Sequence, residues 1–150
     1  MTNLETLLRK YHEDILFRRV CIGSPTWAEM VAEAIMEDRT GKNYDMAKHN
    51  AASIDLVAED GQHVQVKTVG THGSFAGIRR GRDNAALVMV ITTFGDHSRF
   101  FLVPMDEFKR VARTYEYPKR NHFSWEISGS RIRDGLFDAF EVTPKDNVPL

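Results

Sequence analysis

Hydrophobic residues at strand spacing dominate the middle of the chain. Segments 54–58 and 62–69 are rich in β-branched residues and flank Glu59, Asp60 and Gly61, a combination typical of a β-hairpin. The continuous apolar run 85–93 has the length and composition of a strand that is covered on both faces. Shorter patterns of the same kind predict further strands at 44–47, 99–103 and 123–127, with 99–103 joined to the apolar run through a turn at 95–97.

Helical spacing flanks these strands on both sides. Apolar residues recur every three or four positions from Asn3 to about Arg19, as in an amphipathic helix. Ser24 and Pro25 are typical of a helix N-cap and first helical position, and they predict a second helix that continues to about Asp38. Further patterns predict a helix at 105–115 and a closing helix or turn at 132–140.

The segment 70–82 has a composition of its own, with four glycines and three arginines. Glycine destabilises a helix, so we expect a mobile basic loop with one helical turn at most. Arginines on such a loop suit phosphate contacts, because the guanidinium group matches a pair of phosphate oxygens. The candidate nucleic-acid-binding residues here are His72, Arg79, Arg80 and Arg82, followed further along the chain by Lys119 and Arg120.

The turn of the 54–69 hairpin decides which side chains share a face. A two-residue turn at Asp60 and Gly61 would set Asp55 opposite Val66. A three-residue loop, with Gly61 in the left-handed conformation, would instead set Asp55 opposite Gln65. We favour the three-residue loop. Asp55, Gln65 and Lys67 then share one face, while the valines between them point into the core.

The composition describes an ordinary globular chain of one domain, residues 1–150. Hydrophobic residues make up 42% and charged residues 27% of it, which excludes the compositions typical of disorder. The lone Cys21 excludes an intrachain disulfide and a cysteine-based zinc cluster. No apolar run has the length of a membrane span and the N-terminus lacks a signal-peptide core, so we expect an intracellular, cytoplasmic protein without a membrane partner.

Charge is unevenly distributed along the sequence. Residues 61–133 carry 12 basic and 6 acidic side chains, a balance of +6, whereas the whole chain has a net charge of −1. A surface that faces phosphates needs such an asymmetry, although a solvated face of mixed charge is the commoner cause of any single cluster.

The hairpin residues have the chemistry of a metal-dependent hydrolase. Asp55 and Gln65 offer oxygen ligands on adjacent strands, and Mg²⁺ prefers oxygen ligands. A glutamate from the preceding helix, Glu29 or Glu33, would supply the charge that the neutral amide of Gln65 lacks. Lys67 would lie beside the metal ion and stabilise the charge that develops during phosphodiester hydrolysis. The simpler interpretation is that both glutamates are surface acids that favour the helix.

The segment D-L-V-A-E-D-G-Q-H-V-Q-V-K, preceded by a helix containing W-A-E-M-V-A-E-A-I, resembles the PD-(D/E)xK nuclease superfamily in its Q-x-K variant. The resemblance covers roughly residues 24–110. It implies an α/β fold with a restriction-endonuclease-like core, in which helices flank a central mixed β-sheet. It also implies catalytic roles for Asp55, Gln65, Lys67 and Glu29, with Glu33 as the alternative glutamate, and metal ligation by Asp55, Gln65 and Glu29.

These observations predict a Mg²⁺-dependent endodeoxyribonuclease of the restriction or homing type, for which Mn²⁺ substitutes. Its partners would be double-stranded DNA and further copies of the chain in a homodimer or homotetramer, since one active site cuts one strand. Such a protein would come from a prokaryote, an organelle or a phage. One alternative is a nuclease-fold protein that has lost efficient catalysis and acts as a DNA-binding or assembly module. Another is an unrelated enzyme or interaction domain in which Asp55 and Lys67 form a structural ion pair.

Overall fold

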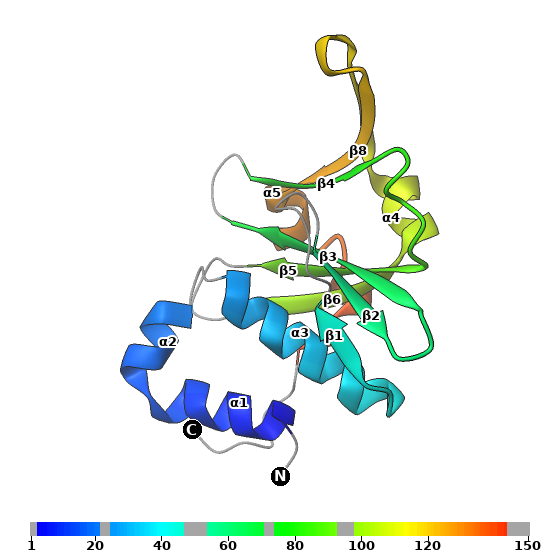
Figure 1. Cartoon of the computed structure of the whole chain (residues 1–150). Helices are drawn as coiled ribbons and strands as arrows, with labels where there is room; N and C mark the ends of the chain where they lie inside the picture. Colours follow the sequence, from blue (N-terminus) through cyan, green and yellow to red (C-terminus); the bar gives the residue numbers. More distant parts are fainter. Residues whose placement is uncertain (1–2, 22–24, 47–53, 71–73, 93–97, 144–150) are drawn as a thin grey trace.

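The chain forms an α/β structure with a mixed five-stranded sheet, a small antiparallel sheet and several helices (Figure 1). The computed structural model describes residues 3–21, 25–46, 54–70, 74–92 and 98–143. The predicted helix cap Ser24, the turn at 95–97 and the candidate His72 lie outside the described residues. For Asp55 the backbone is described and the side chain is not.

The larger sheet has the strand order β1-β2-β3-β5-β6. Strands β3 and β5 are parallel and all other neighbours are antiparallel, so the predicted mixed sheet is confirmed. Both faces of β5 are buried, as its apolar run predicted. The strands are β1 (Tyr44–Met46), β2 (Ile54–Ala58), β3 (His63–Val69), β5 (Leu87–Thr92) and β6 (Arg99–Pro104).

Helix α3 (Pro25–Thr40) covers one face of this sheet. Its stripe of small and branched residues packs against Val64 and Val66 of β3, which confirms the predicted helix and its buried face. The small side chains allow a close approach between helix and sheet. The buried stripe consists of Ala28, Val31, Ala32 and Ile35.

The N-terminal region differs from the single helix that was predicted. It forms α1 (Asn3–Glu13) and α2 (Ile15–Cys21), separated at Asp14. The Asp14 carboxylate accepts a hydrogen bond from the backbone N–H of Phe17 at 3.0 Å, which caps the second helix and stabilises the break. Ile15 and Leu16, which belong to the apolar spacing of the predicted helix, are 57% and 72% exposed. Among the described residues, no helix is long and apolar enough to span a membrane.

The second sheet corrects two predictions. Strand β4 (Phe75–Arg79) lies where a mobile loop was expected, and the alternating burial of Ala76 and Ile78 explains why a strand forms despite Gly77. The helix predicted for 105–115 ends early as α4 (Met105–Val111), because Ala112 adopts an extended conformation and residues Arg113–Tyr117 form strand β7. Strand β8 (His122–Ser128) lies between these two, in the order β4-β8-β7.

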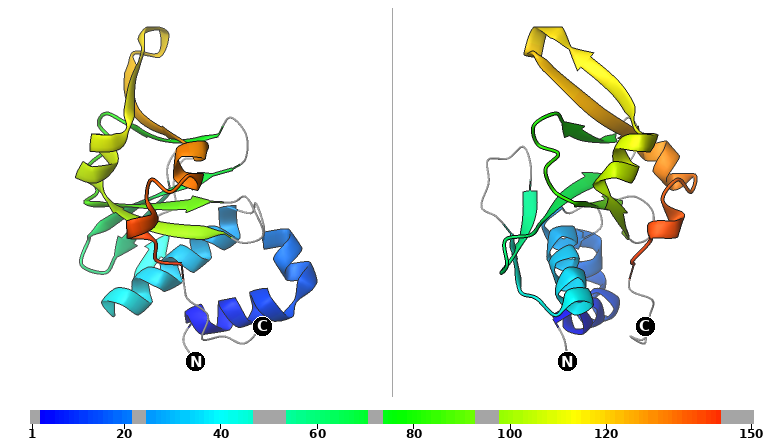
Figure 2. Two further views of the ribbon diagram at one scale, coloured as in Figure 1. Left: turned by 180° about the vertical axis from the view of Figure 1, so that it is seen from behind. Right: turned by 90° about the vertical axis from the view of Figure 1, so that its right-hand side faces the viewer.

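The small sheet and the C-terminal elements cover the other face of the large sheet, where the resemblance implied flanking helices. Their second hydrophobic core contains buried residues of β4, β5, β6 and β8. The predicted closing helix is shorter and begins earlier, as α5 (Gly129–Arg133) followed by a 3₁₀ turn, η2 (Asp138–Phe140). A hairpin made of β7, a second 3₁₀ turn, η1 (Pro118–Arg120), and β8 projects beyond this body (Figures 1 and 2).

Candidate active site

The register of the β2–β3 hairpin is the one that sequence analysis favoured. Asp55 pairs with Gln65, and Leu56 pairs with Val64. Gly61 has a φ of 87°, in the left-handed region, and its N–H donates to the carbonyl of Ala58 at 2.9 Å. The three-residue loop is therefore confirmed, and with it the alignment of Asp55 and Gln65 on neighbouring strands.

Replacing Gly61 tests the turn that fixes this register. An alanine Cβ at this position would contact no described atom within 4 Å, so the cost comes from the left-handed backbone alone. We expect Gly61→Ala to lower the free energy of unfolding by about 1–2 kcal/mol, measured by urea denaturation. Glu59→Ala in the same loop is the control and should change it by less than about 0.5 kcal/mol. Equal stability of Gly61→Ala and the unsubstituted protein would contradict this account of the turn.

Strand alternation separates the candidate side chains from the α3 face. Val64 and Val66 belong to the core beneath α3, so Gln65 and Lys67 point to the opposite face. There Gln65 lies beside Val88 and Lys67 beside Val90 of the parallel strand β5. Gln65 is 3% exposed, whereas Lys67 is partly exposed. The buried amide and the more accessible amine therefore lie in line along one strand face.

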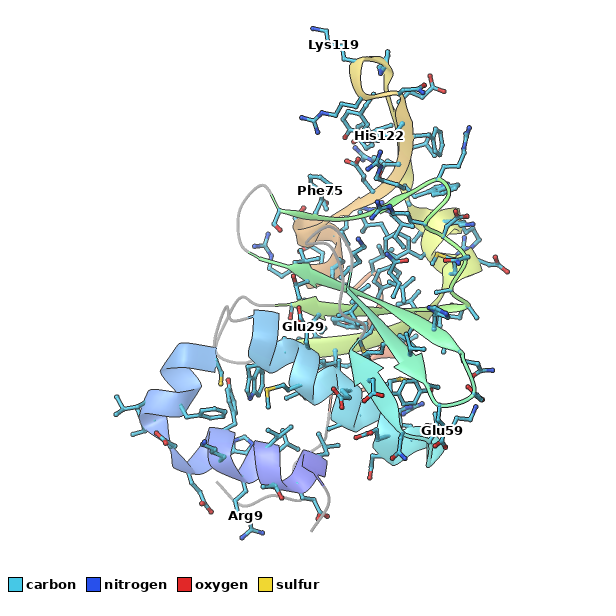
Figure 3. All side chains as sticks on the ribbon, in the orientation of Figure 1. Arg9, Glu29, Glu59, Phe75, Lys119 and His122 are labelled. Atoms are coloured by element: carbon cyan, nitrogen blue, oxygen red, sulfur yellow. The ribbon has the colours of Figure 1, made fainter. Side chains whose placement is uncertain are left out.

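The glutamates of α3 come from the other side of the sheet. Glu29 is 7% exposed and lies in the first half of the helix (Figure 3), and Glu33 follows one turn later. Burial raises the pKa of the Glu29 carboxyl. Burial also raises the pKa of Glu33, with further contributions from the negative charges of Glu37 and Asp45. A helix glutamate therefore reaches the face of Gln65 and Lys67 only around an end or edge of the sheet.

The raised pKa of Glu29 makes stability depend on pH. The folded chain binds the proton of the Glu29 carboxyl group more tightly than the unfolded chain does. The stabilisation that results is complete below the ordinary pKa of 4.5, and it is lost as the pH rises through the raised pKa. Glu29→Gln stays neutral at every pH. We expect this variant to be more stable than the unsubstituted protein near neutral pH, by on the order of 1 kcal/mol, with the difference shrinking toward acid pH.

Urea denaturation across that pH range measures the effect. Glu13→Gln, on the exposed face of α1, is the matched control and should leave the free energy of unfolding near neutral pH unchanged, because an exposed carboxylate carries no burial cost. A gain for Glu29→Gln that is the same at acid and neutral pH would contradict burial of a charge as its cause.

Metal ligands of the usual charged types are not clustered in the described part of the chain. There, no three His, Cys, Asp or Glu side chains lie close enough together to hold a metal ion. The predicted ligand set differs from such a cluster, since it includes the Gln65 amide and the side chain of Asp55. Of the predicted set, the structure aligns the backbone of Asp55 with Gln65 and Lys67, and it places Glu29 and Glu33 on the opposite layer.

The candidate nucleic-acid-binding residues gather on the small sheet. Arg79 is exposed at the end of β4, and Arg80 stacks on the ring of Phe123 with 4.3 Å between the guanidinium carbon and the ring centroid. Lys119 and Arg120 are exposed at the tip of the projecting hairpin (Figure 3). Arg82 lies in the turn after β4, where its N–H donates to the carbonyl of Arg79.

Sequence analysis missed the aromatic residues that accompany these cations. Tyr115 was assigned to the end of the predicted helix and Tyr117 to no element, yet the two alternate with polar residues as in a strand. That alternation, R-T-Y-E-Y, is the signal that would have located β7. Phe123 and Trp125 have packing roles, since Trp125 packs against the second core and the Phe123 ring lies under Arg80.

No protein-family model and no curated protein matches this chain.

Proposed function

We propose that this protein is a Mg²⁺-dependent endonuclease that hydrolyses phosphodiester bonds of double-stranded DNA. Its fold would be a PD-(D/E)xK core in the Q-x-K form, and its action would be of the restriction or homing type. The observation that carries the proposal is the pairing of Asp55 with Gln65 on adjacent strands, with Lys67 two residues further on the same strand face. This order within a mixed sheet, after a helix that carries Glu29, is the arrangement that the resemblance implies.

The residues would divide the chemistry among them. Asp55 and Gln65 would hold the metal ion through oxygen atoms, and Mn²⁺ would substitute for Mg²⁺. When bound, the ion would lower the pKa of an attacking water and neutralise charge on the phosphate. The Lys67 ammonium group would stabilise the additional negative charge that forms on the phosphate oxygens. Lys67 is partly exposed, so its side chain keeps contact with solvent.

A helix glutamate would complete the site. Gln65 is neutral, so for a divalent ion bound by Asp55 and Gln65 alone only one of its two positive charges is balanced. Glu29 is the better candidate to balance it, because it is 7% exposed whereas Glu33 is only partly buried, so its carboxylate gains more from a nearby cation. Glu33 is the alternative. Two copies of the chain, in a homodimer or homotetramer, would supply the two sites that cut both strands.

Cleavage of supercoiled plasmid tests the proposal. The unsubstituted protein should convert it to nicked and linear forms when Mg²⁺ or Mn²⁺ is added, and excess chelator should stop the reaction. Asp55→Ala should abolish the conversion at the same protein concentration. Absence of nicking with either metal, or undiminished nicking by Asp55→Ala, would refute the proposed activity.

A second candidate is a DNA-binding or assembly module that keeps the fold without efficient catalysis. The neutral, almost fully buried Gln65 favours it, because this residue replaces the second carboxylate of an efficient metal site. Under this alternative the protein binds duplex DNA but does not nick it, and Lys67→Ala leaves DNA binding intact.

A further inference from the structure

The small sheet has an inner and an outer face. Ala76, Ile78 and Ile127 point inward and are buried in the second core. Strand alternation and the register of the three strands put a different set of side chains on the other side. This outer face carries Phe75, Arg79, Arg113, Tyr115, Tyr117, His122, Ser124 and Glu126.

Three rings form a continuous row on the outer face. The centroids of Tyr115 and Tyr117 are 6.4 Å apart, and those of Tyr117 and His122 are 4.7 Å apart. Tyr115 is 43% exposed at the outer end of this row. The Nδ1 atom of His122 is buried and has no hydrogen-bond partner among the described residues, so the row also contains an unused polar atom. Such a row offers a flat apolar surface.

A fourth ring lies at the other end of the same face. Phe75 is 51% exposed, and its ring leans over Gly77, where an added Cβ would come within 3.0 Å of it. The ring therefore lies along the sheet instead of projecting into solvent. Phe75 and His122 are labelled in Figure 3, on β4 and on the projecting hairpin respectively. Several exposed rings on one face of a sheet are typical of an interaction site.

The charge of the outer face selects the kind of partner. Arg79 and Arg113 are exposed on the edge strands, and the hairpin tip adds Lys119 and Arg120. The acid on this face, Glu126, accepts a hydrogen bond from the Tyr117 hydroxyl at 2.7 Å. Cations therefore outnumber acids around the rings, which favours a polyanion.

We propose that the outer face of the small sheet binds single-stranded nucleic acid, with bases stacked on Tyr115 and Phe75 and phosphates contacted by the surrounding cations. Aromatic rings on an open sheet, combined with arginines, suit unpaired bases because every base has a flat face to stack. A duplex cannot use these rings in the same way, since neighbouring base pairs already cover its base faces. The surface would let the protein engage an unpaired segment next to duplex DNA.

This binding does not depend on the proposed cleavage chemistry, because it uses no residue of the β2–β3 hairpin. It can be measured in the presence of chelator, where cleavage does not occur. Its failure and the failure of the nuclease proposal are therefore distinguishable: plasmid nicking can be absent while single strands still bind the outer face.

Fluorescence anisotropy with short dye-labelled oligonucleotides tests the proposal. Single-stranded DNA, single-stranded RNA and a DNA duplex of equal length are titrated with the full chain in chelator. We expect a single strand of DNA or RNA to bind more tightly than the duplex. Tyr115→Ala should weaken that binding by about tenfold or more, the loss expected for one base stacked on a ring. Tyr115→Phe should restore it, since the ring is kept.

Leu16→Ala is the matched control, because Leu16 is also exposed and apolar but lies on α2. It should leave the affinity unchanged, and circular dichroism should confirm that all variants are folded. Absence of binding to single strands, or equal affinities of Tyr115→Ala and the unsubstituted protein, would overturn the proposal. So would a Tyr115→Ala variant that changes the oligomeric state while its single-strand affinity stays the same, since the face would then bind a second copy.

Discussion

Lys67→Ala is expected to slow Mg²⁺-dependent DNA cleavage by roughly a hundredfold to a thousandfold, the usual loss when one group that stabilises transition-state charge is removed. Lys67 is partly exposed, so its truncation should leave the thermal unfolding temperature nearly unchanged. Rates are measured with supercoiled plasmid at saturating metal, so that weaker metal binding does not limit the reaction. Lys67→Arg should also be impaired, because a planar guanidinium group does not replace a compact ammonium group.

Lys42→Ala is the matched control for that loss. Lys42 lies near the same hairpin, where its ammonium group pairs with Asp60 of the turn at 2.6 Å. Its removal also takes one positive charge from the protein, but from the far end of the hairpin. Unchanged cleavage by Lys42→Ala and a large loss in Lys67→Ala would locate the effect at the site. Full activity of Lys67→Ala would refute a catalytic role for this lysine.

Gln65 is expected to control the metal requirement. Gln65→Leu keeps the approximate size of the side chain and removes its oxygen, so cleavage at limiting Mg²⁺ should fall about tenfold to a hundredfold. Gln65→Glu should instead lower the Mg²⁺ concentration needed for half-maximal cleavage, because a carboxylate binds a divalent cation more strongly than an amide. The dependence of the cleavage rate on Mg²⁺ concentration measures both effects.

Ser124→Ala serves as the control for burial of a polar group, since Ser124 is buried in the small sheet and donates to the carbonyl of Ile78. It should not change the Mg²⁺ dependence. If Gln65→Leu also left the Mg²⁺ dependence unchanged, Gln65 would be a structural residue of the central strand and not a metal ligand.

The hairpin and the main sheet could be predicted because local signals agree there. The Glu59-Asp60-Gly61 loop has glycine where a left-handed residue is needed, and the flanking β-branched residues fix the strands. The apolar run of β5 and the small-residue stripe of α3 are similarly unambiguous. These elements are the ones that pair Asp55 with Gln65 and put Gln65 and Lys67 on one strand face.

The small sheet could not be predicted because its strands depend on distant partners. The glycines around β4 argue for a loop, and it becomes a strand only because it pairs with β8, nearly fifty positions away. Residues 113–117 continue the helical spacing of α4, yet pairing with β8 outweighs that local tendency. The break at Asp14 arises from a side-chain cap that helical periodicity does not reveal. Because these strands are joined only through long-range pairing with β8, the sequence also did not reveal that Tyr115 and Arg79 share a face of the small sheet.

The position of the helix glutamates likewise depends on the assembled fold. Their spacing placed Glu29 and Glu33 one turn apart, but the packing of α3 on the face opposite Gln65 and Lys67 follows from the contacts of Val64 and Val66. A glutamate of α3 can therefore reach Gln65 and Lys67 only around an end or an edge of the sheet. No local sequence pattern specifies that route.

The most direct test of the central claim is a crystal structure of the protein with Mn²⁺, in which anomalous scattering locates the metal ion. We predict a strong peak between β2 and β3, about 2.0–2.2 Å from a carboxylate oxygen of Asp55 and from the amide oxygen of Gln65, with Glu29 or Glu33 bound directly or through water. Lys67 should lie beside this ion on the same strand face. A peak elsewhere, or none at saturating Mn²⁺, would contradict the assignment of the hairpin as a metal-dependent nuclease site.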